Sequence, residues 1–331
     1  MLDELETLKG YGIGHIIWLD DDLLMNEDRA ISLFNGMVRR NLGMTWDATN
    51  GVIAASLKDE VVAAAAASGC IGLSLGIESG NADILRQIRK PGTPRIFRRA
   101  AEVLKRYPQI NTRALLIIGF PGETIRMIFD TINLVEEMNL DWSNLAILQP
   151  WRSTPIYDAM VEQGLLGEEG KLKDDTSPYQ LGPYSRQRAV EQGKIQQSHF
   201  GEKIGSGHGV DFSNLDRIPT RAELDDIWFY LNVRLNFSRL LREERPVKLK
   251  QQLTWLRYVG TKTAPDNAII LYHWAYLQHR VNNWIEDDLI ERLHGRLRDS
   301  EYWREWFARF GLSMDHVLMA EFPTVEFAEA A

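Results

Sequence analysis

One stretch, residues 70–80, constrains the fold of this chain more than any other. It is a short apolar run bounded by glycines, too compact for a helix, and it predicts a strand buried on both faces. The run ends in Glu78, Ser79 and Gly80. Buried parallel strands carry little polarity along their length, and ligand-binding groups gather at their carboxyl ends. These residues therefore indicate a ligand site or, as the simpler alternative, a cap on the helix that follows.

The same design recurs along the first half of the chain, where expected strands and helices alternate five times. The expected strands are residues 15–19, 44–48, the stretch from Cys70, 112–118 and 145–148. Alternation of buried strands with helices predicts a parallel sheet with right-handed crossovers. An open doubly wound sheet is the competing architecture, but no G-x-G-x-x-G follows the first strand.

Polar residues and glycines follow each expected strand. In a barrel-like parallel sheet all these strand ends share one face, so they would surround a single pocket. The groups in question are Asp20 to Asp22, Thr49 and Asn50, Glu78 and Ser79, Gly119 to Glu123, and Gln149.

Composition sets outer bounds on what the protein does. At 331 residues the chain can bury a full core and predicts two domains. Its net charge of −8 argues against a nucleic-acid partner, because such binders usually show clustered Lys and Arg. No apolar run is long enough to cross a bilayer and no secretory signal opens the chain, so we expect a cytoplasmic protein.

The motifs resemble the radical S-adenosylmethionine superfamily, particularly the branch whose members often carry an N-terminal cobalamin-binding domain. The similarity is carried, in order, by residues 18–22, 69–80, 118–124 and 149–157. It covers roughly the first half of the chain and implies strands two to six of a partial (β/α)6 barrel. A 4Fe–4S cluster would reduce bound S-adenosylmethionine and release a 5′-deoxyadenosyl radical that attacks a small-molecule substrate. Methylation or cyclisation, with or without cobalamin, are the outcomes that the resemblance leaves open.

The resemblance also implies roles for the residues at the strand ends. The carboxylate and hydroxyl after the third strand would contact the ribose or methionine part of the cofactor. The glycine-rich loop after the fourth would let the backbone approach the adenine. The aspartates after the first would bind the methionine amino group, a cation that suits carboxylates. The cofactor-binding residues implied in this way are Asp20, Asp21, Asp22, Glu78, Ser79, Gly119, Phe120, Pro121, Gly122, Glu123 and Gln149.

Several of these residues have a simpler explanation as well. Glu123 also suits the start of a helix, where the macrodipole favours an acid. One or two of the three aspartates are equally explained as solvated or capping residues.

The cluster ligands are where the chain departs from the family. The family's CxxxCxxC loop follows the first barrel strand, and this chain has neither; its single cysteine, Cys70, lies in an expected strand and is interpreted as a small buried residue. Our leading interpretation is the C-terminal part of a larger enzyme, with a missing N-terminal region or a partner chain holding the cluster. The alternative is a non-catalytic relative that binds a nucleoside or serves as a scaffold.

The predicted organisation has three parts. Residues 1–166 form the incomplete barrel, and residues 167–218 are a polar, glycine-rich, extended connection. A helical domain fills residues 219–331, opening with a capping box from Thr220 to Glu223. Its aromatic residues at helical spacing are interpreted as core, and His273, His279 and His294 make no metal-ligand pattern.

Overall fold

The computed structural model describes residues 1–20, 22–166 and 212–319. The chain divides into two compact units. The first comprises Met1–Ile117 with Met127–Ala146, and the second comprises Ile118–Arg126 with Ile147–Ala331. The three-part division made from the sequence stays a prediction, and residues 167–211 of its connecting segment lie outside the described residues.

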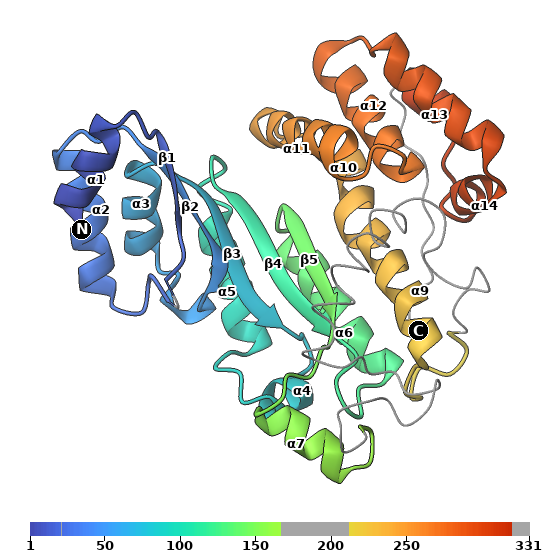
Figure 1. The fold of residues 1–331 in the computed structure, drawn as a ribbon, viewed down its shortest axis with the longest axis horizontal. Helices are drawn as coiled ribbons and strands as arrows, with labels where there is room; N and C mark the ends of the chain where they lie inside the picture. Colours follow the sequence, from blue (N-terminus) through green and yellow to red (C-terminus); the bar gives the residue numbers. More distant parts are fainter. Residues whose placement is uncertain (21, 167–211, 320–331) are drawn as a thin grey trace. The chain divides into compact units, whose positions relative to one another are not determined.

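A five-stranded sheet is the centre of the first unit (Figure 1). Its spatial order follows the order along the chain, and β1 to β4 pair in parallel. A doubly wound sheet would reverse its strand order at a switch point, whereas sequential order is typical of barrel-like sheets. The α/β, partial-barrel prediction is therefore confirmed. The strands are β1 (His15–Trp18), β2 (Thr45–Val52), β3 (Cys70–Glu78), β4 (Asn111–Ile118) and β5 (Trp142–Ile147).

Helices connect the strands, and several of them begin at side-chain caps. Asn26 accepts a hydrogen bond from the amide of Arg29, and Asn81 and Thr93 cap the helices that begin at Ala82 and Pro94 in the same way. The helices are α1 (Leu2–Gly10), α2 (Glu27–Arg39), α3 (Asp59–Ala67), α4 (Ala82–Gln87), α5 (Pro94–Leu104) and α6 (Ile125–Met138), with a 3₁₀ turn η1 (Ala54–Ser56).

The two faces of the sheet differ in polarity. On one face Trp46 of β2 stacks on Phe34 of α2, with ring centroids 4.9 Å apart, and both rings are fully buried. Because side chains alternate along a strand, the next residue, Asp47, lies on the opposite face. Ser74 of β3 pairs with Arg113 of β4 on that face. The sheet thus has an apolar face toward the helices and a second face that carries polar side chains.

Two strand boundaries differ from the sequence prediction by more than one residue. Thr49 and Asn50 do not follow β2 but lie within it, since the strand continues to Val52. Between Ala48 and Val52 the pairing with β3 is irregular, and the extra residues interrupt the alternation that a sequence pattern relies on. The fifth strand begins at Trp142, three residues before the predicted start. Its buried positions alternate with exposed ones, so its first residues do not form the continuous apolar run on which the prediction relied.

The C-terminal region within the second unit is helical over its described residues, which confirms that part of the fold prediction. Within it α12 is buried along most of its length, and Trp303, Trp306 and Phe307 pack in the core. No helix among the described residues is long and apolar enough to cross a membrane. The elements are α7 (Pro155–Glu162), α9 (Arg221–Asn232), α10 (Ser238–Arg242), α11 (Pro246–Tyr258), α12 (Ala268–Asn282), α13 (Asp287–Asp299), α14 (Glu301–Arg309) and α15 (Met314–Met319), with π-helical turns η2 (Val233–Phe237) and η3 (Val259–Thr263).

Candidate functional site

Glu78 ends β3 in a strained backbone conformation. Its φ of +63° is left-handed, which costs a residue with a side chain on the order of 1 kcal/mol. Nζ of Lys90 donates a hydrogen bond to its carboxylate at 2.9 Å. Gly76 leaves room for the lysine, because a Cβ there would lie 2.8 Å from Nζ. The middle strand of the sheet therefore ends in a half-buried ion pair.

Ser79 and Gly80 fasten this end of β3 to α6. The Ser79 hydroxyl is fully buried, lies 3.1 Å from Oγ1 of Thr131 and accepts a hydrogen bond from the amide of Asn81. The Gly80 amide donates to the same threonine oxygen at 2.8 Å, and a Cβ on Gly80 would lie 2.6 Å from the Thr131 Cα. These contacts hold Glu78 in position; a direct contact between Ser79 and a cofactor stays a prediction.

The aspartates after β1 fold back on their own loop. Oδ1 of Asp20 accepts the amide of Asp22 at 3.1 Å, and Oδ1 of Asp22 accepts the amide of Leu24 at 3.3 Å. Burial raises the pKa of Asp22, and the nearby amide of Ile53 offsets part of that rise. Its second oxygen, Oδ2, is buried and has no partner of hydrogen-bond geometry among the described residues. Such an oxygen suits a donor from a ligand. Asp21 lies outside the described residues.

Glu123 closes the loop that follows β4, in the second unit. One carboxyl oxygen, Oε2, accepts the amides of Gly119 at 2.6 Å and Phe120 at 3.1 Å. The side chain is 1% exposed, and this burial raises its pKa to about 8. The other oxygen, Oε1, is buried and makes no hydrogen bond within the described part of the chain. At neutral pH the group is therefore mostly protonated and has one free polar position.

The remaining predicted residues lie in or just after these loops. Gly119 and Gly122 have φ of +84° and +77°, which favours glycine at both positions. Phe120 and Pro121 are buried between them. Gln149 follows β5 by two residues and is exposed. Because these residues and Glu78 belong to different units, the single shared pocket inferred from the sequence stays a prediction.

Sequence reasoning missed Lys90, although its signal was present. It lies three residues after the end of the short helix α4 and directly precedes Pro91-Gly92, a turn signal. It also missed the polar face of the sheet. There Nε2 of His15 lies 3.9 Å from Asp47, and the Ser74 hydroxyl is 1% exposed with no hydrogen-bond partner in the described residues.

Cys70 does not suit a metal or a cluster. Its thiol is buried, and burial raises its pKa to about 12, whereas metal ligation needs the thiolate. The interpretation of Cys70 as a small buried residue is confirmed. No group of three potential metal ligands occurs among residues 1–20, 22–166 and 212–319.

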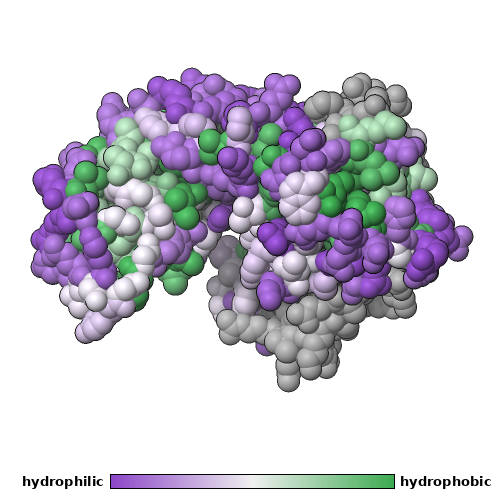
Figure 2. All heavy atoms as spheres, turned by 90° about the horizontal axis from the view of Figure 1, so that it is seen from above, coloured by the Kyte–Doolittle hydropathy of each residue, from purple (hydrophilic) through white to green (hydrophobic). Residues whose placement is uncertain are grey.

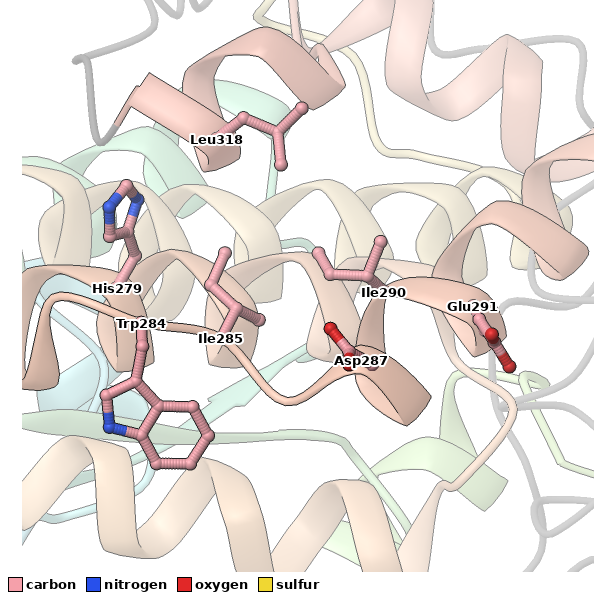
Figure 3. A pocket seen from close by; sticks show the side chains of 7 residues that line it. All are labelled: His279, Trp284, Ile285, Asp287, Ile290, Glu291 and Leu318. Carbon is pink, nitrogen blue, oxygen red and sulfur yellow. The ribbon is translucent and has the colours of Figure 1, made fainter.

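A cavity of about 490 Å³ lies in the helical unit, at residues that the sequence analysis did not single out for binding. Figure 3 shows Leu318 of α15 facing Ile285 and Ile290, with Trp284 at one end. His279 holds its place by donating from Nδ1 to the carbonyl of Val317 at 2.8 Å. The buried His273 likewise donates to the carbonyl of Ile269, and both histidines are structural in these contacts.

Comparison with known proteins agrees with the motifs. Residues 1–135 match the sequence profile described as Radical SAM superfamily. An uncharacterised methyltransferase of Pyrococcus horikoshii is 29% identical over 167 residues, which are 50% of this chain and 36% of that protein. The anaerobic magnesium-protoporphyrin IX monomethyl ester cyclase of Rubrivivax gelatinosus is 26% identical over 196 residues, 59% of this chain and 34% of the relative. The matched part thus spans about a third of these relatives.

Comparison with solved structures aligns the chain with two radical S-adenosylmethionine enzymes. The methyltransferase TsrM from Kitasatospora setae, solved with cobalamin and a [4Fe–4S] cluster, aligns with a TM-score of 0.44 and 19% identity over 50% of this chain and 33% of its own. The cobalamin-dependent enzyme OxsB aligns with a TM-score of 0.41 and 14% identity over 97% of this chain and 52% of its own.

Proposed function

We propose that this chain, whose residues 1–135 match the Radical SAM superfamily profile, binds S-adenosylmethionine within an enzyme acting on a small molecule. The observation that carries the proposal is Glu78. A strained, half-buried carboxylate at the end of the middle strand of a parallel sheet stands where ligand-binding groups gather. Strain of this kind persists where the surrounding structure holds it, here through Ser79, Gly80 and Thr131.

The polar groups of the first unit match the polar groups of the methionine and ribose parts of the ligand. The carboxylate of Glu78 suits ribose hydroxyls, which are donors. Lys90 supplies the cation that the methionine carboxylate needs, and Oδ2 of Asp22 suits the methionine ammonium. Asp20 supports this role by accepting the amide of Asp22.

The loop after β4 suits the adenine. Adenine presents ring-nitrogen acceptors beside an amino donor. A protonated Glu123 offers one O–H donor at Oε1, while its Oε2 holds the amides of Gly119 and Phe120. The glycine backbone between them has no side chain to keep a flat ring away. Gln149 adds an exposed amide after β5.

The iron–sulfur cluster does not fit the residues present, since the chain has one cysteine and its thiol is buried. We therefore assign no step of radical formation to this chain. In the superfamily, S-adenosylmethionine supplies an adenosyl radical, and the protein binds, orients and excludes water. The cluster ligands are proposed to come from another segment or a partner chain; cobalamin dependence stays a prediction.

The free edge of the sheet supports that proposal. β1 pairs with β2 alone among the described strands, and Leu2 of the helix before it packs against Gly36 of α2. An exposed apolar edge of this kind is what an added strand covers. Figure 2 shows apolar side chains gathered in patches on the surface. The exposed large side chains in and around β1 are Tyr11, Ile13, Ile17, Leu19 and Met25.

The relatives suggest only the type of reaction that the whole enzyme catalyses. The names of the two relatives point to methyl transfer in one and to ring closure in the other. We propose one of these reaction types. The polar face that carries His15, Asp47, Ser74 and Arg113 is available to hold substrate polar groups.

Calorimetric titration of the chain with S-adenosylhomocysteine, an unreactive analogue, tests the proposal. We expect binding, and a dissociation constant raised at least about tenfold by Glu78→Gln, because the ribose hydroxyls would then donate to a neutral oxygen in place of a charged one. The matched control is Glu102→Gln, which breaks another Glu–Lys pair, on α5, without touching the strand end. Absence of binding, or equal effects of the two variants, would refute the assignment.

The buried cysteine also favours a second candidate, a nucleoside-binding relative without radical chemistry. Both candidates bind the analogue, so the distinction lies in the cluster. Expression of the chain from its full reading frame, and co-expression with candidate partner chains, each followed by iron and sulfide analysis, separate them. An iron–sulfur protein that cleaves S-adenosylmethionine supports the enzyme, and a cluster-free protein that binds the analogue supports the second candidate.

A further inference from the structure

The first turn of α6 is capped by a distant part of the chain. The amides of Ile125 and Arg126 have no acceptor within their own helix, as in any first turn. They donate to the carbonyls of Arg217 at 3.1 Å and Leu215 at 2.8 Å. We call residues 214–217 the strap. The carbonyls of the strap accept hydrogen bonds from amides that could otherwise bind an anion. This end of α6 therefore binds the strap.

Side chains reinforce the strap at both ends. The Arg126 guanidinium donates from Nε to Oδ1 of Asp216 at 2.6 Å and from Nη2 to Oδ2 at 3.2 Å, which lowers the pKa of Asp216. Arg217 in turn pairs with Glu223 of α9, whose carboxylate also accepts the Thr220 amide. This pairing with Arg217 is the main reason that the pKa of Glu223 falls to about 2. The strap thus joins the start of α6 to the capping box of α9.

A second contact reaches the loop from the same helix. Leu224 of α9 is 0% exposed, and its Cδ1 lies 3.0 Å from the point where a Cβ on Gly119 would stand. Gly119 also has a φ of +84° and donates its amide to Glu123. The left-handed turn at the start of the loop therefore rests directly on the Leu224 side chain.

We propose that the helical unit positions the loop from Gly119 to Glu123 through the strap and Leu224, so that Leu224 and Asp216 are positioning residues for the ligand bound there. This inference rests on the proposed function for the identity of that ligand. It gives the helical unit a role that its sequence alone does not reveal: it holds the buried Glu123 carboxyl and the two glycine turns in one geometry.

Hydrogen exchange of the ligand-free chain tests the positioning role. We expect Leu224→Ala to raise the exchange rates of the amides of residues 119–126 about tenfold or more. The lost packing energy lowers the free energy that is needed to open this loop locally. The matched control is Leu293→Ala on α13, also 0% exposed in the same unit, which should leave these amides unchanged. Equal acceleration by both variants, or none by Leu224→Ala, would overturn the inference.

A surface variant covers the case in which Leu224→Ala fails to fold. Asp216→Asn breaks the pair with Arg126, and we expect faster exchange at Ile125 and Arg126 together with a dissociation constant for S-adenosylhomocysteine raised about threefold. Asp299→Asn, in an exposed pair with Arg298, is the control. If the unaltered chain does not bind the analogue, the proposed function fails, and the exchange rates still test the positioning role. If the amides of Ile125 and Arg126 exchange at the same rate in Asp216→Asn as in the control, the inference fails.

Discussion

Replacing Glu123 by glutamine should remove one defined component of the pH dependence of stability. The carboxyl has an ordinary pKa of 4.5 and a pKa of about 8 in the folded chain, owing mainly to burial. The folded state therefore retains a proton that the unfolded state releases. The stability from this group is fully present below pH 4.5 and is lost as the pH rises through about 8.

The magnitude follows from the two pKa values. Linkage gives a loss of about 2 to 3 kcal/mol in the free energy of unfolding between roughly pH 6 and pH 9 from this group alone. Glutamine keeps an oxygen that accepts the amides of Gly119 and Phe120, and it places an uncharged amide where Oε1 lies. It does not titrate, so this loss should be absent in Glu123→Gln.

Urea unfolding of both proteins, followed by far-ultraviolet circular dichroism at about pH 6, 7, 8 and 9, measures the effect. All other titrating groups are shared, so the difference between the two free energies isolates Glu123. We expect the unaltered chain to lose about 2 to 3 kcal/mol relative to the variant across this range. A difference that is constant to within about 0.5 kcal/mol, or a gain in stability of the unaltered chain over the variant as the pH rises, would refute the argument from burial.

Three further outcomes follow from the same contacts. Lys90→Met should raise the dissociation constant for S-adenosylhomocysteine about tenfold in calorimetric titration, since it removes the cation beside Glu78; unchanged affinity would exclude Lys90 from the site. Gly80→Ala should destabilise the chain by about 3 kcal/mol in urea unfolding, because its Cβ would meet the Thr131 backbone. Gly122→Ala, where the space is open and only the left-handed φ opposes a side chain, should cost about 1 kcal/mol; equal losses would contradict the steric argument. Cys70 should react with a thiol reagent only after unfolding, and rapid labelling of the folded chain would show that its thiol is accessible.

The alternation of strands and helices was predictable because it rests on local signals. Asn26, Asn81, Thr93 and Thr220 begin helices as their capping chemistry requires. The polar end of the strand from Cys70 was equally visible. The irregular pairing in β2 was not, since an interruption of register depends on the neighbouring strand and leaves no periodic trace.

The contacts that give the site its chemistry lie between residues distant in sequence. The pairing of Lys90 with Glu78 and the anchoring of Gly80 on Thr131 depend on how loops return to the sheet. The strap could not be predicted either, because Leu215 and Arg217 contact α6 through backbone carbonyls, which any residue type supplies. Sequence patterns locate the candidate residues. The tertiary structure decides which of them hold the site in position and which can contact the ligand.

Hydrogen exchange of the chain with and without saturating S-adenosylhomocysteine tests the central claim of cofactor binding most directly. The account predicts slower exchange on binding at residues 77–80 and at residues 118–123, with no change at residues 284–291 beside the helical cavity. Protection confined to that cavity, or no protection anywhere, would contradict it.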